Sequence, residues 1–313
     1  MRPALLVLAF VTAVLLAACG GGGSNKDTPA TTGPLVGSGA KLKVVATTTQ
    51  IGDFTRNIAG DHIELTTLVQ PNQDPHTLEL SKEQTDRVKA ANLVLRNGLG
   101  LDAFVDKAID AKKQRVIDLS TLVDTQPRRT EKTVIDPHYW FDVQNAITMA
   151  DGIEKALAAA DPDNAGAYTT NAAAYRQKLA DLNEEMFRLA AGVPPSCRHL
   201  ITNHDALGYF GSSFTYEIEA NVIPSLSTKD GATGKDIAAA VEKAQRFHVS
   251  VVFAEASSDS KLIEEVARQA GVRVVYGIYT DSLGPPGSDG ATYIDAMLSD
   301  GRKIAEAIKT CHE

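Results

Sequence analysis

Four short polar motifs along the chain each carry one side chain that is able to bind a metal ion. The motifs are DPH (74–76), DPHYW (136–140), NHD (203–205) and YTDS (279–282), and their candidate ligands are His76, His138, His204 and Asp281. Neutral imidazole is the commonest protein ligand for zinc and similar ions, and three imidazoles with one carboxylate complete a four-coordinate shell. The motifs lie roughly 60 to 80 residues apart, far beyond the short spacing of a zinc finger. A shared site therefore depends on the fold.

Carboxylates accompany these motifs and could orient the histidines. A metal-binding histidine usually donates its second ring N–H to a carboxylate or a carbonyl. Proline precedes two of the histidines and fixes the local backbone. The predicted supporting carboxylates are Asp74, Asp136 and Asp205 beside the histidines, Glu79 shortly after the first, and Glu255, which we expect to be buried and hydrogen-bonded at a strand end.

A single histidine in a sequence is more often a structural or surface residue than a metal ligand. We assign His62, His199, His248 and His312 to that class. The hypothesis of a metal site rests on the four motifs acting together, and their spacing alone does not establish it.

Short β-rich runs alternate with helical segments on both sides of the middle of the chain. This alternation is typical of βαβ units, so we predict an α/β fold with two lobes, each a parallel-rich sheet flanked by helices. In the first half we expect strands at 42–48, 63–69, 93–95 and from 116, and helices at 48–57, 81–90 and 102–112. In the second half we expect strands at 199–202, 220–225, 250–254 and 272–278, and helices at 206–216, 234–247, 260–270 and 293–308.

The middle of the chain is helical. Residues 143–160 are predicted to form one helix, and Asp161-Pro162 then gives a cap followed by proline at a first helical position. The next helix runs to about Ala191, roughly 30 residues or about 45 Å, which is too long for one small domain. We predict an N-terminal lobe at 41–160, a rigid bridging helix at 161–193 and a C-terminal lobe at 194–313. Because ligands bind at the carboxyl ends of parallel strands, the four motifs are expected to meet in the cleft between the lobes.

The N-terminal region has the pattern of an export signal. Residues 1–18 contain one arginine and a nearly uninterrupted apolar run from Ala4 to Ala18, which has the length of a signal-peptide core. The run ends in LAACG (16–20), which resembles the bacterial lipobox and predicts lipidation of Cys19; the alternative is a plain signal peptide. Residues 19–40 are rich in Gly, Ser, Thr and Pro and are predicted to form a flexible tether to the membrane.

Net charge and cysteine content exclude some classes of partner and one kind of metal site. The formal net charge of −8 argues against nucleic acid and against an anionic lipid surface as partners. Cys197 and Cys311 form an even pair in an oxidising compartment, so a disulfide is predicted, with two free thiols as the alternative. A cysteine-ligated metal is disfavoured because the sequence has no CxxC spacing.

Together the motifs resemble one known family. DPHTLE (74–79), DPHYWFD (136–142), NHDALGYF (203–210), VVFAEASSDSK (251–261) and IYTDSLG (278–284) are similar to those of the zinc/manganese solute-binding lipoproteins of ABC transporters, the cluster A-I or cluster 9 receptors. The resemblance covers about residues 41–310 and implies two α/β lobes bridged by one long helix. It implies that His76, His138, His204 and Asp281 bind the metal, and that the partners are an ABC permease and its ATPase. We expect a monomer that is lipid-anchored on the extracytoplasmic side of the cell membrane and moves little on metal release.

The choice between zinc and manganese rests on positions that agree with the family pattern and on positions that depart from it. His204 is similar to zinc-type members, whereas manganese-type members usually have Glu at that position. Two features differ from the family pattern: Leu78 and Leu80 replace the Tyr and Pro that often flank the glutamate, and the stretch 124–136 contains no histidine. Because a shell of three nitrogens and one oxygen favours zinc, we predict Zn2+, with Mn2+ as the alternative.

Two other function classes remain as alternatives. A zinc-dependent hydrolase would use the three histidines as an open catalytic site with Asp281 as the base. The sequence contains neither HExxH nor GxSxG, so we predict no enzyme activity. A surface adhesin is the third class, and no motif supports it specifically.

Overall fold

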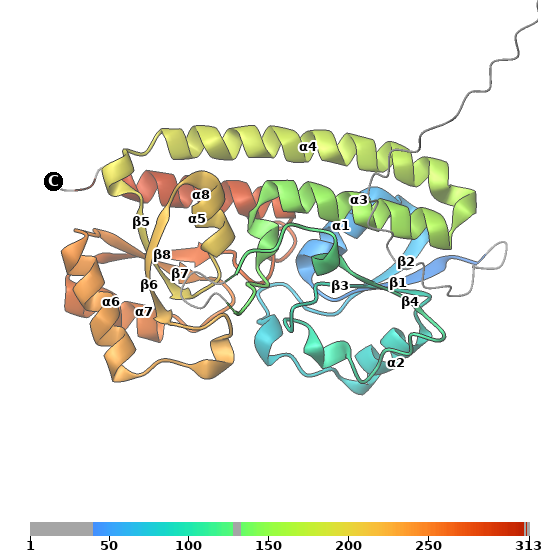
Figure 1. Ribbon diagram of the computed structural model, residues 1–313, viewed down its shortest axis with the longest axis horizontal. Coiled ribbons are helices and arrows are strands. Elements are labelled where there is room, and N and C mark those ends of the chain that lie inside the picture. Colours follow the sequence, from blue (N-terminus) through green and yellow to red (C-terminus); the bar gives the residue numbers. More distant parts are fainter. Residues whose placement is uncertain (1–39, 128–132, 310, 312–313) are drawn as a thin grey trace, which may run out of the picture. The chain divides into compact units, whose positions relative to one another are not determined.

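The computed structural model describes residues 40–127, 133–309 and 311. The predicted signal peptide, Cys19 and nearly all of the predicted tether lie outside the described residues. Two α/β lobes follow one another along the described chain, and the long helix α4 (Ala165–Ala191) connects them (Figure 1). No helix in the described ranges is long and apolar enough to cross a membrane.

The N-terminal lobe is built on a parallel four-stranded sheet in the order β2-β1-β3-β4. Thr48 caps the first helix through its side chain, and Ser81 forms a capping box with Gln84 at the start of the second. The bounds are β1 (Leu42–Ala46), α1 (Thr49–Ala59), β2 (Ile63–Thr67), α2 (Lys82–Ala90), β3 (Leu93–Arg96) and β4 (Arg115–Asp118), with the 3-10 turns η1 (Gly60–His62), η2 (Pro75–Thr77), η3 (Ala103–Val105), η4 (Leu119–Thr121) and η5 (Tyr139–Phe141).

The prediction of a helix at 102–112 is wrong. Only the short turn η3 forms there, and the Asp102 side chain does not cap it. The Asp102 carboxylate instead accepts hydrogen bonds from the backbone N–H groups of Asn97 and Gly98, and from the guanidinium of Arg96 at 3.1 Å. An aspartate that satisfies loop donors in this way competes with helix formation.

Helices α3 (Val143–Ala160) and α4 pack against each other along the N-terminal lobe. A 3-10 turn, η6 (Pro162–Asn164), separates them, so the bridging helix begins at Ala165 and has 27 residues, or about 40 Å. Its buried positions recur every three or four residues, which gives one continuous apolar face along its length. They are Tyr168, Ala172, Tyr175, Leu179, Leu182, Met186 and Ala190.

The C-terminal lobe repeats the parallel arrangement, with strand order β6-β5-β7-β8. Helix α8 lies alongside α4, whereas α6 and α7 pack together at the other side of the lobe (Figure 1). The bounds are η7 (Pro195–Cys197), β5 (His199–His204), α5 (Gly208–Phe214), β6 (Glu217–Ile223), η8 (Thr228–Asp230), α6 (Gly234–Arg246), β7 (Val251–Glu255), α7 (Lys261–Ala270), β8 (Arg273–Ile278) and α8 (Tyr293–Ile308).

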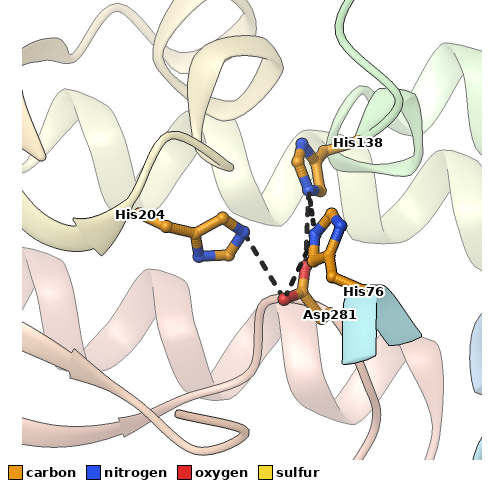
Figure 2. Close-up of side chains that lie close together, drawn as sticks. All are labelled: His76, His138, His204 and Asp281. Carbon is orange, nitrogen blue, oxygen red and sulfur yellow. Dashed lines mark hydrogen bonds and ion pairs between the residues drawn. The ribbon is translucent and has the colours of Figure 1, made fainter. Parts of the chain in front are cut away.

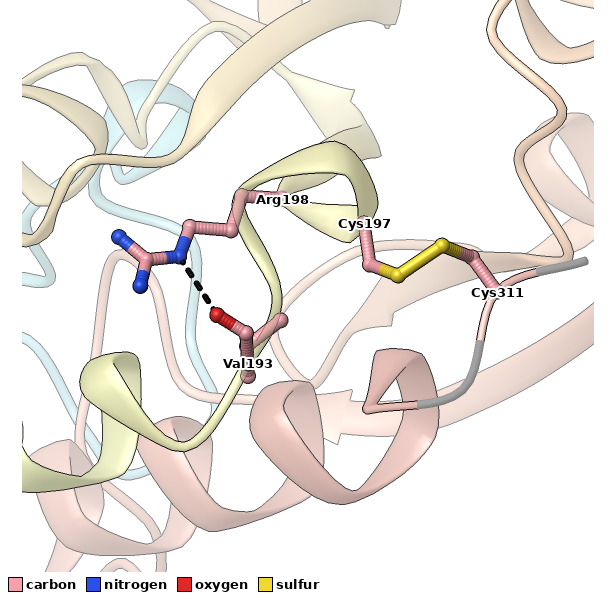
Figure 3. Close-up of a disulfide and its surroundings, with 4 residues drawn as sticks. All are labelled: Val193, Cys197, Arg198 and Cys311. Atoms are coloured by element: carbon pink, nitrogen blue, oxygen red, sulfur yellow. Dashed lines mark hydrogen bonds between the residues drawn. A yellow bond between two sulfur atoms is a disulfide. The ribbon is translucent and has the colours of Figure 1, made fainter. Parts of the chain in front are cut away.

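A disulfide joins Cys197, in the turn after α4, to Cys311, beyond the end of α8 (Figure 3). The two Cα atoms are 5.4 Å apart, and the bridge closes a loop of 114 residues. Beside it, Arg198 Nε donates a hydrogen bond to the Val193 carbonyl at 3.0 Å. The bridge therefore links the exit of the bridging helix to the last described residues.

Candidate metal centre

The four candidate ligands lie together where the two lobes meet (Figure 2). One donor atom from each of His76, His138, His204 and Asp281 lies within 4.8 Å of the others. The first two residues come from the N-terminal lobe and the last two from the C-terminal lobe. His138, His204 and Asp281 are fully buried, whereas His76 is 9% exposed.

The Asp281 carboxylate faces all three imidazole rings. Its Oδ1 lies 3.4 Å from His138 Nε2, and its Oδ2 lies 3.4 Å from His204 Nε2 and 3.8 Å from His76 Nε2. The Nε2 atoms of His76 and His138 are 3.4 Å apart. Four donors bound at about 2.0–2.1 Å to one tetrahedral ion lie roughly 3.3–3.4 Å from one another. Three of these donor distances are those of a tetrahedral shell around a single ion, and the distance from His76 to Asp281 is about 0.4 Å longer.

Three of the atoms that face the centre of the four-residue site have no hydrogen-bond partner among the described residues. Nε2 of His204 and both carboxylate oxygens of Asp281 are buried and form no hydrogen bond within the described residues. A buried polar atom without a partner costs about 1–3 kcal/mol, and a bound cation would provide the missing interaction. Three imidazole nitrogens and one carboxylate oxygen suit a divalent transition metal.

A carboxylate holds each of two histidines by both its backbone and its ring. Asp136 Oδ1 accepts hydrogen bonds from His138 N at 2.9 Å and from its ring Nδ1 at 2.7 Å. At the end of β7, Glu255 uses Oε1 for His204 N at 2.9 Å and Oε2 for its ring Nδ1 at 2.7 Å. Glu255 Oε2 also accepts from the Thr280 hydroxyl at 3.0 Å. These bonds place a proton on Nδ1, so Nε2 is the ring atom that faces the site in each histidine.

His76 is positioned by the turn η2. Asp74 caps this turn, and its Oδ1 accepts a hydrogen bond from His76 N at 2.8 Å. Pro75 occupies the first position of the turn, where its missing N–H costs nothing. The second oxygen of Asp74 accepts from the hydroxyl of Thr228, in the C-terminal lobe, at 2.6 Å. The segment that carries His76 is thus bonded to the opposite lobe.

Asp281 lies in the loop after β8, and contacts from both lobes fix this loop. Tyr279 N donates to both oxygens of Asp300, a buried residue of α8, at 3.0 and 3.1 Å. On the other side, Leu283 N donates to Thr49 Oγ1 of the N-terminal lobe at 2.8 Å. The loop therefore presents Asp281 to the histidines of both lobes.

Burial and neighbouring charges set the protonation of the site. Burial lowers the pKa of His76 to about 3. Burial also acts to lower the pKa of His138, but the Asp136 carboxylate and then Asp281 raise it to about 9. For His204, burial is likewise outweighed by Asp281 and a second carboxylate, which raise its pKa well above 6.5. Burial opposes the charge on Asp281, but His204 and His138 hold its pKa well below 3.8.

The five predicted supporting carboxylates divide into three groups. Asp136 and Glu255 contact histidine rings directly. Asp74 holds a histidine by its backbone N–H and not by its ring. Glu79 is exposed and forms no hydrogen bond or ion pair within the described part of the chain, and Asp205 accepts from a side-chain amide on β6 at 2.9 Å. Neither of these last two contacts the ring of a candidate ligand.

Sequence reasoning missed three residues that shape the site. Thr228 and Asp300 bond to site segments from distant parts of the chain, and no local pattern marks them. Gly208 lies against Asp136, where an added Cβ would be 2.8 Å from Oδ2. A glycine within the motif NHDALGYF was the available signal for this close approach.

Known proteins of similar sequence are metal receptors. A family model described as zinc-uptake complex component A, periplasmic, matches residues 44–307. The manganese ABC transporter substrate-binding lipoprotein PsaA of Streptococcus mitis is 33% identical over 97% of both chains. The metal ABC transporter substrate-binding lipoprotein ScbA of Streptococcus cristatus is 32% identical, again over 97% of both chains.

Solved structures agree with the predicted fold. The periplasmic zinc binding protein TroA from Treponema pallidum superimposes with a TM-score of 0.82 and 26% identity, covering 86% of this chain and 99% of that one. The Mn-bound periplasmic metal binding protein from Candidatus Liberibacter asiaticus gives 0.77 and 25%, covering 86% and 100%. The prediction of two parallel-sheet α/β lobes joined by a long helix is confirmed. The chain belongs to the zinc-uptake component A family of ABC-transporter metal-binding receptors, a family of solute-binding proteins and not of enzymes.

Proposed function

We propose that this receptor captures Zn2+ with His76, His138, His204 and Asp281 and delivers it to an ABC permease driven by its ATPase. The observation that carries the proposal is the convergence of the four donor atoms, each within 4.8 Å of the others. Three imidazoles with one carboxylate suit a four-coordinate zinc ion, whereas manganese prefers more oxygen ligands.

Manganese is the second candidate cargo because PsaA, at 33% identity, is named a manganese receptor. Mn2+ usually takes six ligands, so it would need both Asp281 oxygens and further donors in a buried site. We therefore expect this site to bind Zn2+ more tightly than Mn2+.

Metal binding to the folded chain is expected to raise the melting temperature by mass action. After removal of metal with a chelator, equimolar Zn2+ should stabilise the protein more than equimolar Mn2+, and native mass spectrometry should detect one zinc ion per chain. The variant His204→Ala should lose the shift, whereas His62→Ala, at an exposed position away from the site, should keep it. Equal stabilisation of wild type and His204→Ala would exclude this site, and stronger stabilisation by Mn2+ would exclude zinc as cargo.

We also propose that the mature chain is anchored through a lipid on Cys19 and acts on the extracytoplasmic side of the membrane. The lipobox-like sequence and the lipoprotein names of PsaA and ScbA support this. Mass spectrometry of the membrane-extracted protein should give a lipid-modified N-terminus at Cys19, and Cys19→Ser should release the protein from the membrane. An unmodified N-terminus would refute the anchor.

A further inference from the structure

His76 differs from the other three candidate ligands in its access to solvent. It lines a cavity of about 780 Å3 between the lobes, which we call the boundary cavity. Its lining residues come from three segments, which lie between Pro75 and Ala108 and between Val134 and Pro137 in the N-terminal lobe, and between Ser225 and Lys229 in the C-terminal lobe. His138, His204 and Asp281 are fully buried and do not line it. Of the four ligands, His76 alone connects the site to this cavity.

Within the described part of the chain, one side-chain hydrogen bond joins the segments that carry the two walls of the boundary cavity beside His76. The hydroxyl of Thr228 donates to Asp74 Oδ2 at 2.6 Å, and the other oxygen of Asp74 accepts from His76 N at 2.8 Å. We call the Thr228–Asp74 bond the latch. It joins turn η8 of one lobe to turn η2 of the other, and these two turns pack against each other.

The segment that carries Thr228 is suited to local movement. It lies between the end of β6 at Ile223 and the start of α6 at Gly234, and its turn ends at Gly231, whose φ is +65°. Within η8, Ser227 caps the turn through Lys229 N, so Thr228 moves together with a compact turn. Breaking the latch would free this turn from η2 without breaking a bond to any of the four ligands.

Building on the proposed function, we propose that the metal ion enters and leaves past His76 through the boundary cavity, and that the latch controls the rate of this exchange. Thr228 and Asp74 are positioning residues, since neither supplies an atom to the donor set that converges on the site. Without the latch, the path past His76 opens more readily, both for a metal ion that enters and for one that leaves. Association and release should accelerate together, and the equilibrium affinity should change little.

The test uses stopped-flow kinetics with Zn2+ as the probe. Trp140 is the one tryptophan of the sequence, and its ring centroid lies 5.4 Å from that of His138. Its fluorescence can therefore report metal binding. A chromophoric chelator can report metal release. Thr228→Val keeps the side-chain shape but cannot donate a hydrogen bond to Asp74. It should raise the association and release rates about fivefold each, which is equivalent to about 1 kcal/mol. The Kd should stay within about twofold of wild type.

Two matched variants separate the latch from general damage. Thr228→Ser keeps the hydroxyl and should retain wild-type rates. Thr170→Val removes an exposed hydroxyl that bonds only within α4, to Gly166 O, and should also be neutral. Wild-type rates in Thr228→Val would overturn the latch. A rise in release and in Kd with unchanged association would do the same, because it would mean damage to the metal shell.

A further variant tests the route itself. Ala103 is exposed and lines the boundary cavity, so Ala103→Trp should narrow it and slow association and release alike. Unchanged rates in a folded Ala103→Trp protein would exclude this route. If wild type bound no zinc at all, the proposed function would fail first and the latch with it, a result distinct from normal binding with unaltered kinetics.

Discussion

The two carboxylates that hold histidine rings should not be equivalent when each is replaced by its amide. Asp136 uses one oxygen, Oδ1, for both hydrogen bonds to His138. In Asp136→Asn the amide oxygen can still accept both, so the variant loses mainly the negative charge. Glu255 uses separate oxygens for the N–H and the ring of His204. In Glu255→Gln one of these donors must face an amide NH2 group.

This difference sets the expected magnitudes. Replacing a group that orients a metal-binding histidine typically weakens metal affinity by about 10- to 100-fold. Asp136→Asn should lie near about tenfold, which is about 1.4 kcal/mol. Glu255→Gln should lie near about 100-fold, because a buried donor left without a partner costs a further 1–3 kcal/mol or so. The order of the two variants is the feature that the structure predicts.

Competition titration of Zn2+ between each variant and a chromophoric chelator at neutral pH would measure these affinities. Glu154→Gln is the control, since Glu154 is a carboxylate on α3 that accepts a hydrogen bond from Thr169 at 2.7 Å, outside the site. Melting curves without metal would show that each variant is folded. Equal losses, or a larger loss in Asp136→Asn, would refute the reasoning from the two bonding patterns.

Three further predictions concern protons, packing and the disulfide. Because the pKa of His138 is raised to about 9, its ring carries a second proton at pH 7 that zinc should displace, and the raised pKa of His204 acts in the same direction. Affinity should therefore fall as pH falls below about 9, and calorimetry in buffers of different ionisation enthalpy would count the protons; a count of zero would contradict these protonation states. Gly208→Ala should push the Asp136 carboxylate and weaken zinc binding about tenfold, whereas Gly166→Ala, where nothing lies within 4 Å of an added Cβ, should leave titrations unchanged. Reducing the disulfide, which closes a loop of 114 residues, should lower the free energy of unfolding by about 2–4 kcal/mol in denaturant titrations, and an unchanged midpoint would show that the bridge contributes nothing.

Local sequence patterns predicted most of the regular elements. The helix at 143–160 and the final helix at 293–308 have the predicted bounds, because each has an apolar periodicity and a polar cap at its start. The prediction of a helix at 102–112 is wrong because no side-chain cap forms at the start of that segment. Aspartate often caps a helix, but the three-dimensional arrangement commits the Asp102 carboxylate to Arg96 and to loop N–H groups.

The candidate site was only partly predictable. Each histidine and Asp281 follows from a motif, and Asp136 is two residues from the ring it holds. Glu255 was predicted as a buried supporting carboxylate, but its pairing with His204, 51 residues away, was not, and neither was the bond of Thr228 to Asp74, 154 residues away. Such partners depend on which strands and turns become neighbours, and a periodicity argument within one element contains no information about that.

The contacts of Tyr293 indicate why exchange of the ion should involve local movement and not a wide opening of the lobes. Tyr293 begins α8, just after the loop that carries Asp281, yet its N–H donates to Asp53 of α1 at 3.1 Å and its hydroxyl donates to the Trp140 carbonyl at 2.6 Å. Its ring also packs edge-on against Phe54 at 4.9 Å. Separating the lobes here would break two buried hydrogen bonds and expose aromatic surface to water. Opening at the Thr228 turn breaks one partly buried side-chain bond, so it is the path of lower cost.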